Sequence, residues 1–119
     1  MIQLIYCSNA KSNIQQSELD DILETARNFN SKNNISGCLL FFNDEFIQIL
    51  EGDEQIVKNL YTQIEQDKMH SDVLLLAIEK IDARKCDVKI IDNDLGRNFC
   101  EEYHIQGSSN LAYQFFGLY

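Results

Sequence analysis

Apolar residues along the chain fall into short runs and into longer stretches with helical spacing. Residues 2–7 are rich in β-branched and aromatic types, which is typical of a strand. From Leu19 to Phe29 apolar residues recur every three or four positions, so a helix is predicted there, with Ser17 as its N-cap. The continuous apolar run 35–42 is typical of a strand that is buried on both faces.

The next segment carries a hairpin signal and a second helix. Asn43 and Asp44 favour a tight turn, so the strand 35–42 is expected to pair with a strand over 45–50. Asp53 is then expected to act as the N-cap of a helix. The apolar face of this helix is predicted to consist of Ile56, Val57, Leu60, Tyr61 and Ile64.

Two further strands are predicted over 73–81 and 87–91, which completes the order β-α-β-β-α-β-β. This order predicts an α+β fold, a ferredoxin-like sandwich with a mixed sheet and both helices on one face. We expect residues 1–92 to form this domain. Residues 93–119 are expected to form a helical C-terminal tail, which packs on the open face of the sheet or on a partner subunit.

Length, charge and cysteine content narrow the classes of function. The 119 residues suffice for one domain, and 19 acidic against 10 basic residues give a net charge of −9. This charge argues against nucleic acid as a partner, and the sequence shows neither a membrane-spanning run nor an export signal. The cysteines lack Cys-x-x-Cys spacing, so we expect reduced thiols, a cytoplasmic location and no metal site. They are Cys7, Cys38, Cys86 and Cys100.

Few residues suggest catalytic chemistry. Signature motifs for nucleotide binding, serine hydrolysis and zinc proteolysis are absent, and His70 and His104 are the only histidines. Several carboxylates are expected at solvated helix starts, where the helix dipole favours them. These are Asp20, Asp21, Glu24, Glu51, Asp53 and Glu54.

Three polar residues stand where apolar ones are expected. Tyr6 lies within the first strand, Gln48 interrupts the apolar strand 45–50, and Asn30 lies at the end of the first helix. Each has an ordinary interpretation: a core aromatic for Tyr6, a solvent-facing side chain for Gln48 and a helix C-cap for Asn30. The alternative is that Gln48 faces a buried polar partner, since a buried amide must be paired.

Five sequence blocks, read together, resemble the BLUF family of blue-light sensors that bind flavin. The block at residues 35–39 is similar to the family's Ile-Thr-Gly-x-Leu, the block at 46–52 to its Phe-x-Gln-x-Leu-Glu-Gly and the block at 67–70 to its Asp-x-Arg-His. They follow the family's order, and the resemblance covers residues 1–92. The blocks are Leu4-Ile5-Tyr6-Cys7-Ser8, Ala26-Arg27-Asn28-Phe29-Asn30, Ile35-Ser36-Gly37-Cys38-Leu39, Phe46-Ile47-Gln48-Ile49-Leu50-Glu51-Gly52 and Asp67-Lys68-Met69-His70.

The resemblance implies that FAD, with FMN and riboflavin as alternatives, binds between the two helices. Tyr6 would give an electron and a proton to the photoexcited flavin, and Gln48 would rearrange its hydrogen bonds between Tyr6 and the flavin. Asn30 would hold the carbonyl and amide edge of the ring. The other flavin contacts implied are Ser8, Arg27, Asp67, His70, Ile22, Ala26 and Ile64.

The chain departs from the family pattern at two places. Met69 stands where the family often carries an Arg. In the register set by Arg84, Lys89 and Ile91 stand where the family usually has a Trp and a Met, which are implicated in signal relay. We therefore expect the relay in this chain to differ from that of its relatives.

The leading hypothesis is a photoreceptor that is not an enzyme, whose sheet and tail surface changes in light for a protein partner or a second copy of the chain. One alternative is a flavin-binding scaffold with an impaired relay. Another is a ferredoxin-like interaction domain without flavin, in which Gln48 would face solvent. A flavin enzyme is disfavoured because the chain lacks polar groups for a second substrate.

Overall fold

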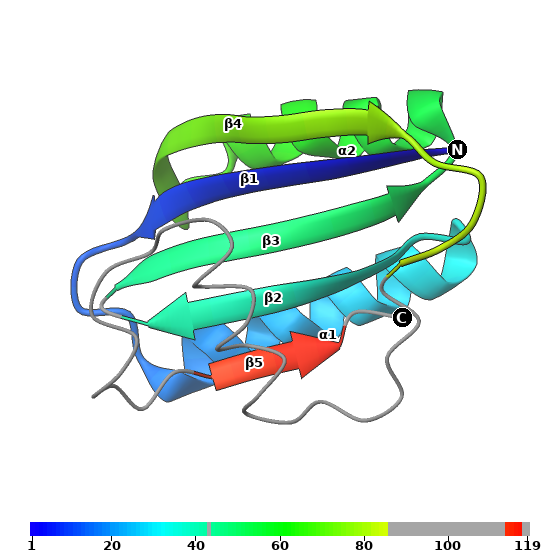
Figure 1. The fold of residues 1–119 in the computed structure, drawn as a ribbon. Helices are drawn as coiled ribbons and strands as arrows, with labels where there is room; N and C mark the ends of the chain where they lie inside the picture. The colour runs from blue at the N-terminus through cyan, green and yellow to red at the C-terminus, as the bar shows by residue number, and fades with distance from the viewer. Residues whose placement is uncertain (43, 86–113, 118–119) are drawn as a thin grey trace.

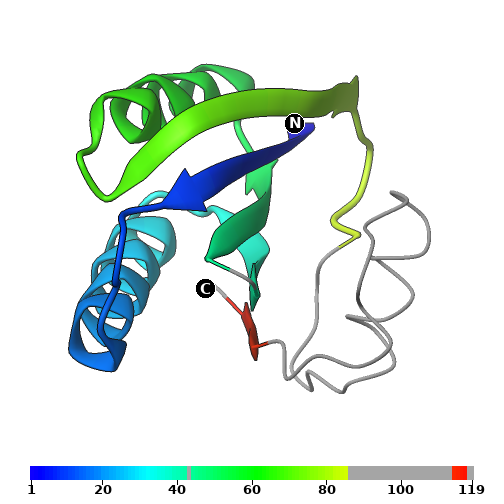
Figure 2. The ribbon, with the colours of Figure 1, turned by 90° about the vertical axis from the view of Figure 1, so that its left-hand side faces the viewer.

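The computed structural model describes residues 1–42, 44–85 and 114–117 as one sheet with two helices. The strand order in the sheet is β4-β1-β3-β2-β5. Both helices lie on the same face of the sheet (Figures 1 and 2). The elements are β1 (Ile2–Ala10), α1 (Gln16–Lys32), β2 (Ser36–Phe42), β3 (Glu45–Gly52), α2 (Glu54–Gln66), β4 (His70–Lys80) and β5 (Gln114–Gly117).

The order β-α-β-β-α-β and the placement of both helices on one face confirm the predicted ferredoxin-like α+β fold. The prediction of a mixed sheet is wrong for these five strands, because all four strand pairs are antiparallel. The reason is topological. The helical crossover makes β2 parallel to β1, but β3 lies between them, so every spatial neighbour runs in the opposite direction.

The predicted helical tail is wrong for the four residues of it that the structure describes. Gln114–Gly117 is the strand β5, which pairs with β2 from Cys38 to Phe41. Without β5, β2 would present an unpaired edge of backbone donors and acceptors, and two adjacent Phe residues suit a strand. The predicted strand 87–91 lies outside the described residues, and the domain division at residue 92 stays a prediction.

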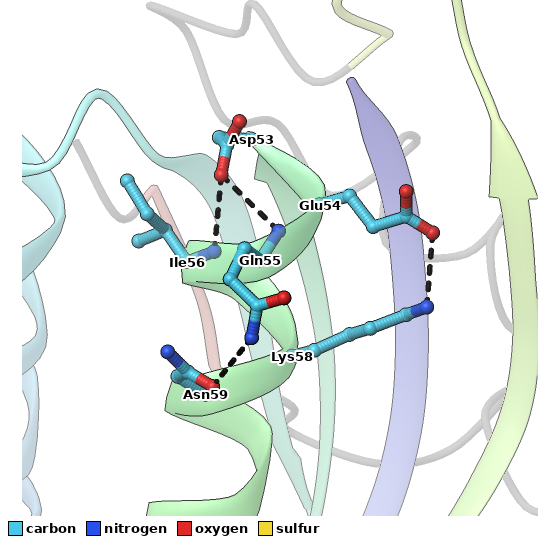
Figure 3. Close-up of polar contacts among 6 residues, drawn as sticks. All are labelled: Asp53, Glu54, Gln55, Ile56, Lys58 and Asn59. Carbon is cyan, nitrogen blue, oxygen red and sulfur yellow. Dashed lines mark hydrogen bonds and ion pairs between the residues drawn. The ribbon is translucent and has the colours of Figure 1, made fainter.

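The start of α2 shows how a local signal defines an element. As predicted, Asp53 is the N-cap, and its carboxylate accepts hydrogen bonds from the backbone N–H groups of Gln55 (3.1 Å) and Ile56 (3.2 Å; Figure 3). Lys58 and Glu54, one turn apart, form an ion pair of 2.9 Å on the exposed side. These contacts begin the helix directly after β3.

The first helix begins earlier than predicted. Its N-cap is Gln15 and not Ser17, and the Gln15 backbone N–H donates to the Glu18 carboxylate at 3.1 Å. The helix ends at Lys32, with Asn33 as its C-cap, within the Asn-rich stretch 30–34 where it is expected to stop. Asn30 is therefore a residue of the last turn, and its interpretation as a C-cap is wrong. None of the described helices is long and apolar enough to cross a membrane.

Alternate residues of the central strands form the core beneath the helices. Leu4 and Tyr6 of β1 and Leu50 of β3 belong to one buried cluster with Val57 of α2, and Phe46 of β3 belongs to a second. Because side chains alternate along a strand, Gln48 lies on the same face as Phe46 and Leu50. The register of β3 thus brings an amide side chain into the layer between sheet and helices.

Gly37 is predicted to be intolerant of any side chain. A Cβ at this position would lie 2.1 Å from the backbone oxygen of Ile49 on the neighbouring strand, so β2 and β3 would have to move apart. Gly37→Ala is expected to lower the free energy of unfolding by about 1–3 kcal/mol, measured by urea denaturation. Gly52→Ala serves as the comparison, since its closest contact would be 3.2 Å. Equal stabilities of Gly37→Ala and wild type would contradict this account.

Candidate functional site

A cavity of about 360 Å³ lies on the helix-bearing side of the sheet, between side chains of α1 and α2. Its wall surface is mostly apolar, with polar side chains standing among the lining residues, as in sites that bind small organic molecules. The residues that line it are Tyr6, Glu18, Asp21, Ile22, Thr25, Ala26, Phe29, Asn30, Leu39, Gln48, Leu60, Gln63, Ile64, Asp67, Met69 and His70.

A tyrosine–glutamine pair from the two central strands forms part of this wall. Tyr6 of β1 and Gln48 of β3 are direct partners in the antiparallel register. Tyr6 is fully buried and Gln48 is 6% exposed. The Tyr6 hydroxyl donates a hydrogen bond to the side-chain oxygen of Gln48. The solvent-facing interpretation of Gln48 is therefore wrong, since its amide has the buried polar partner that burial demands.

The environment of Tyr6 keeps its phenol protonated. Burial raises the pKa of Tyr6 well above its ordinary value, and the neighbouring Tyr61 and Asp67 raise it further. The Tyr61 ring lies edge-on to the Tyr6 ring at a centroid distance of 5.7 Å. Tyr6 is thus a neutral hydrogen-bond donor at neutral pH.

A second buried amide reaches the cavity from the helix layer. Asn30 is 1% exposed and lines the cavity from the last turn of α1. Its backbone oxygen accepts hydrogen bonds from the backbone N–H groups of Asn33 (3.2 Å) and Ile35 (2.9 Å), which anchor this turn to the start of β2. These bonds fix the backbone of Asn30, and its buried side chain lines the cavity, where an amide can pair with a ligand that carries both a carbonyl and an N–H.

His70 lies at the start of β4 and is held by Ser8. The Ser8 hydroxyl and the His70 Nδ1 are 2.8 Å apart, and Ser8 itself is buried. Burial lowers the pKa of His70 below its usual value, and the Asp67 carboxylate opposes this shift in part. Asp67 also organises the approach to β4, because its carboxylate accepts from the Met69 backbone N–H at 3.0 Å. Ser8 contributes to the site through His70 and does not line the cavity.

The geometry brings together most of the side chains that sequence reasoning selected. Among the predicted site residues that the structure describes, two do not line the cavity. These are Ser8 and Arg27, and Arg27 is exposed on α1. The proposed relay positions Lys89 and Ile91 lie outside the described residues. Eight predicted residues share the cavity, and their roles toward a ligand stay predictions: Tyr6, Gln48, Asn30, Asp67, His70, Ile22, Ala26 and Ile64.

Sequence reasoning missed several lining residues of α1. Glu18, Asp21, Thr25 and Phe29 lie three or four positions apart, so they share one helix face with Ile22 and Ala26. That spacing is present in the sequence, but a solvated helix start accounts for Asp21, and no sequence signal singles out Glu18. The same attribution was wrong for Glu51, which is a fully buried residue of β3.

Fold and site together define a ferredoxin-like domain with a buried tyrosine–glutamine pair beside a mainly apolar cavity under two helices. A family model described as BLUF, sensors of blue-light using FAD, matches residues 1–89. The chain therefore belongs to the BLUF family. This confirms the predicted class, a blue-light sensor domain that uses flavin.

Relatives of known identity carry this domain within longer chains. The chain is 38% identical over 84 residues to photoactivated adenylate cyclase subunit alpha of Euglena gracilis, which is 71% of this chain and 8% of that protein. It is 32% identical over 82 residues to the blue light- and temperature-regulated antirepressor BluF of Escherichia coli K12, which is 69% of this chain and 20% of that protein. The match thus covers only a small part of each of these relatives.

Solved structures agree with the assignment. The photo-activated state of BlsA superimposes with a TM-score of 0.66 at 34% identity, over 69% of this chain and 60% of that chain. A bacterial light-regulated adenylyl cyclase superimposes with a TM-score of 0.72 at 25% identity, over 87% of this chain and 34% of that chain. The longer reference chains include parts that have no counterpart in the 119 residues.

The neutral state of His70 predicts a pH dependence of stability. The pKa of His70 is lowered in the folded protein, so the unfolded chain takes up this proton first, near the ordinary value of 6.5. The stabilisation is present above that pH and is lost as the pH falls toward the lowered pKa, by at most about 1.4 kcal/mol per pH unit.

His70→Gln is accordingly expected to flatten the dependence of the unfolding free energy on pH between pH 5 and 7. Urea denaturation at pH 5, 6 and 7 measures this slope. The carboxylates titrate in both proteins, so the difference between the two slopes isolates His70. An identical slope for wild type and variant would contradict a buried, neutral imidazole.

Proposed function

We propose that this protein is a blue-light photoreceptor without enzymatic activity, in which Tyr6 and Gln48 form the photoactive pair. The observation that carries the proposal is the buried hydrogen bond from the Tyr6 hydroxyl to Gln48 at the wall of the cavity. A phenol can be oxidised and carries a proton to give. A primary amide can act as donor and as acceptor.

The cavity suits a flavin in size and in chemistry. Its apolar walls accept a flat aromatic ring, and its buried amides match the carbonyl and N–H groups at the edge of an isoalloxazine. Asn30 would hold that edge, whereas Ile22, Ala26 and Ile64 would enclose the ring. Asp67 and His70 would lie at the far edge or the ribityl side. Ser8 would position His70, and the exposed Arg27 would contact flavin atoms outside the cavity.

When bound, a flavin supplies absorption of blue light and an excited state that oxidises neighbouring groups. Tyr6 would give one electron and its hydroxyl proton to the excited flavin, so the hydrogen bond that Gln48 accepts in the dark would be lost. The Gln48 amide, which offers both a carbonyl and an NH₂ group, would rotate or tautomerise to satisfy the changed environment. After the electron and the proton return from the flavin to Tyr6, Gln48 would keep its new arrangement until it relaxes.

FAD is the proposed cofactor, with FMN and riboflavin as alternatives. Three carboxylates line the cavity, from Glu18, Asp21 and Asp67, and the lining residues described by the structure include neither Lys nor Arg. Lys11 forms an ion pair with Glu18. Phosphate groups are therefore expected to lie outside the cavity, so that the ring and not the phosphate tail determines recognition.

The output is proposed to pass to a protein partner or to a second copy of the chain. In the described part of the chain, the exposed large apolar residues are Met1 and four residues of the edge strand β4: Leu74, Leu75, Leu76 and Ile78. Clustered apolar exposure of this kind is typical of interaction surfaces. Neither nucleic acid nor membrane is proposed as a partner. We also propose a cytoplasmic location, in keeping with the free thiols of Cys7 and Cys38.

The two alternatives differ in what they require of Gln48. A ferredoxin-like interaction domain without flavin predicts that Gln48 faces solvent, whereas its side chain is buried against Tyr6. A flavin-binding scaffold with an impaired relay requires the same cavity and the same pair as a working receptor. It differs only in whether light changes the binding of a partner or the size of the oligomer.

The proposal is tested by absorption spectroscopy of the purified protein before and after blue light. A bound flavin and a small, reversible red shift are expected. Tyr6→Phe and Gln48→Leu should both retain flavin and lose the shift, because each removes one side of the photoactive hydrogen bond. A protein that stays colourless after incubation with FAD would contradict the proposal.

Tyr61→Phe is the matched control for this experiment. It removes the same hydroxyl group from a tyrosine whose ring lies 5.7 Å from that of Tyr6 but which does not line the cavity. The red shift should survive in this variant. Its loss would mean that the effect of Tyr6→Phe is not specific to the hydrogen bond with Gln48.

A further inference from the structure

The strand that carries Gln48 also carries a buried carboxylate on its other face. Gln48 of β3 pairs with Tyr6 and with Leu39, whereas Glu51, three residues further on, pairs with Gln3 of β1 and Ser36 of β2. An odd spacing along a strand places two side chains on opposite faces. Glu51 is fully buried, so its charge needs partners within the protein.

The carboxylate of Glu51 holds two separate segments. The Gln3 side-chain amide donates to Glu51 Oε2 at 2.9 Å. The backbone N–H of Lys85 donates to both carboxylate oxygens at 3.0 Å. Lys85 belongs to the segment that follows β4, which Figure 1 shows crossing the ends of β1 and β3 toward the start of β2. Glu51 therefore ties this segment to the centre of the sheet.

Arg84 extends the same connection across the sheet. One guanidinium nitrogen donates to the backbone oxygen of Glu51 at 3.0 Å and to the Ser36 hydroxyl at 2.6 Å. The other nitrogen donates to the backbone oxygen of Asn34 at 2.5 Å. Lys85 adds an ion pair with Glu79 of β4 at 2.8 Å. We refer to Glu51, Arg84 and Lys85, with these contacts, as the Glu51 clamp.

The clamp is sensitive to movement of β3 along its own axis. Gln48 and Glu51 lie three positions apart on one extended strand, about 10 Å, so a shift of the strand along its axis moves both. If β3 shifts along its axis to accommodate the new hydrogen bonds of the Gln48 amide, the carboxylate and the backbone oxygen of Glu51 would move together with it. Several hydrogen bonds to residues 84–85 would weaken at once, since each depends on a narrow range of distance and angle.

We propose that Glu51 is a positioning residue that couples the Gln48 site to the segment leaving β4, and that light loosens the Glu51 clamp. This inference rests on the proposed function. Lys85 precedes the predicted relay positions Lys89 and Ile91 by four and six residues along the chain. Through the clamp, a change at Gln48 would reach residues 84–85 without the Trp and Met that the family usually has at the predicted relay positions, Lys89 and Ile91.

Hydrogen exchange at the Lys85 backbone amide, measured by NMR in the dark and under blue light on the flavin-loaded protein, tests the proposal. In the wild type, light should speed this exchange at least about threefold. Glu51→Gln should speed the dark exchange about tenfold or more, because a neutral amide oxygen replaces a two-oxygen acceptor. The variant should keep the flavin spectrum and the red shift, but its light–dark difference at Lys85 should disappear.

Glu45→Gln is the matched control, because it makes the same substitution at the exposed start of the same strand. Its exchange at Lys85 should equal that of the wild type in dark and in light. If Glu51→Gln does not fold, Arg84→Gln removes the guanidinium contacts but leaves the carboxylate, and faster dark exchange is again expected.

The outcomes separate the clamp from the proposed function. A wild type that shows the red shift but no light effect at Lys85 would overturn the coupling, as would dark exchange in Glu51→Gln equal to that in Glu45→Gln. Loss of the red shift in Glu51→Gln would assign Glu51 to the integrity of the photoactive site instead. Absence of any red shift in the wild type would count against the proposed function, whereas the dark comparison would still test the clamp.

Discussion

The buried hydrogen bond between the Tyr6 hydroxyl and the Gln48 side chain constrains how β1 and β3 can pair. Either group, buried without a partner, would cost about 1–3 kcal/mol. A slip of one residue between the two strands would turn one of the two side chains to the opposite face and leave the other alone. The register that satisfies this bond is also the register that places Leu4 opposite Leu50 in the core. The polar pair and the apolar packing therefore favour the same register of β1 and β3.

Both faces of β3 carry a polar group that is buried and paired. Gln48 faces the cavity under the helices, and Glu51 faces the opposite side, where Gln3 and the backbone of Lys85 hold its carboxylate. β3 is bonded to β1 on one side and to β2 on the other, so it is the strand best placed to carry a displacement across the sheet. This arrangement gives a physical reason why a change confined to one amide could be felt at the opposite face.

The elements with local signals could be predicted from the sequence, whereas relations across the sheet could not. Asp53 predicts the start of α2, and the turn signal Asn43-Asp44 predicts the hairpin of β2 and β3. The antiparallel order depends on β3 lying between β1 and β2, which no local pattern encodes. Alternation could not orient Gln48, because β3 is buried on both faces from Phe46 to Gly52. The burial of Glu51 could not be predicted either, because its partners, Gln3 and the backbone of Lys85, are distant from it in the sequence.

The central claim is that light rearranges the hydrogen bonds of the Gln48 side chain. Light-minus-dark infrared difference spectroscopy of flavin-loaded protein with isotope-labelled glutamine side chains measures this directly. The account predicts a label-sensitive shift of a side-chain carbonyl band, which is present in the wild type and absent in Gln48→Leu. A difference spectrum that is insensitive to the label, or one that Gln48→Leu leaves unchanged, would contradict it.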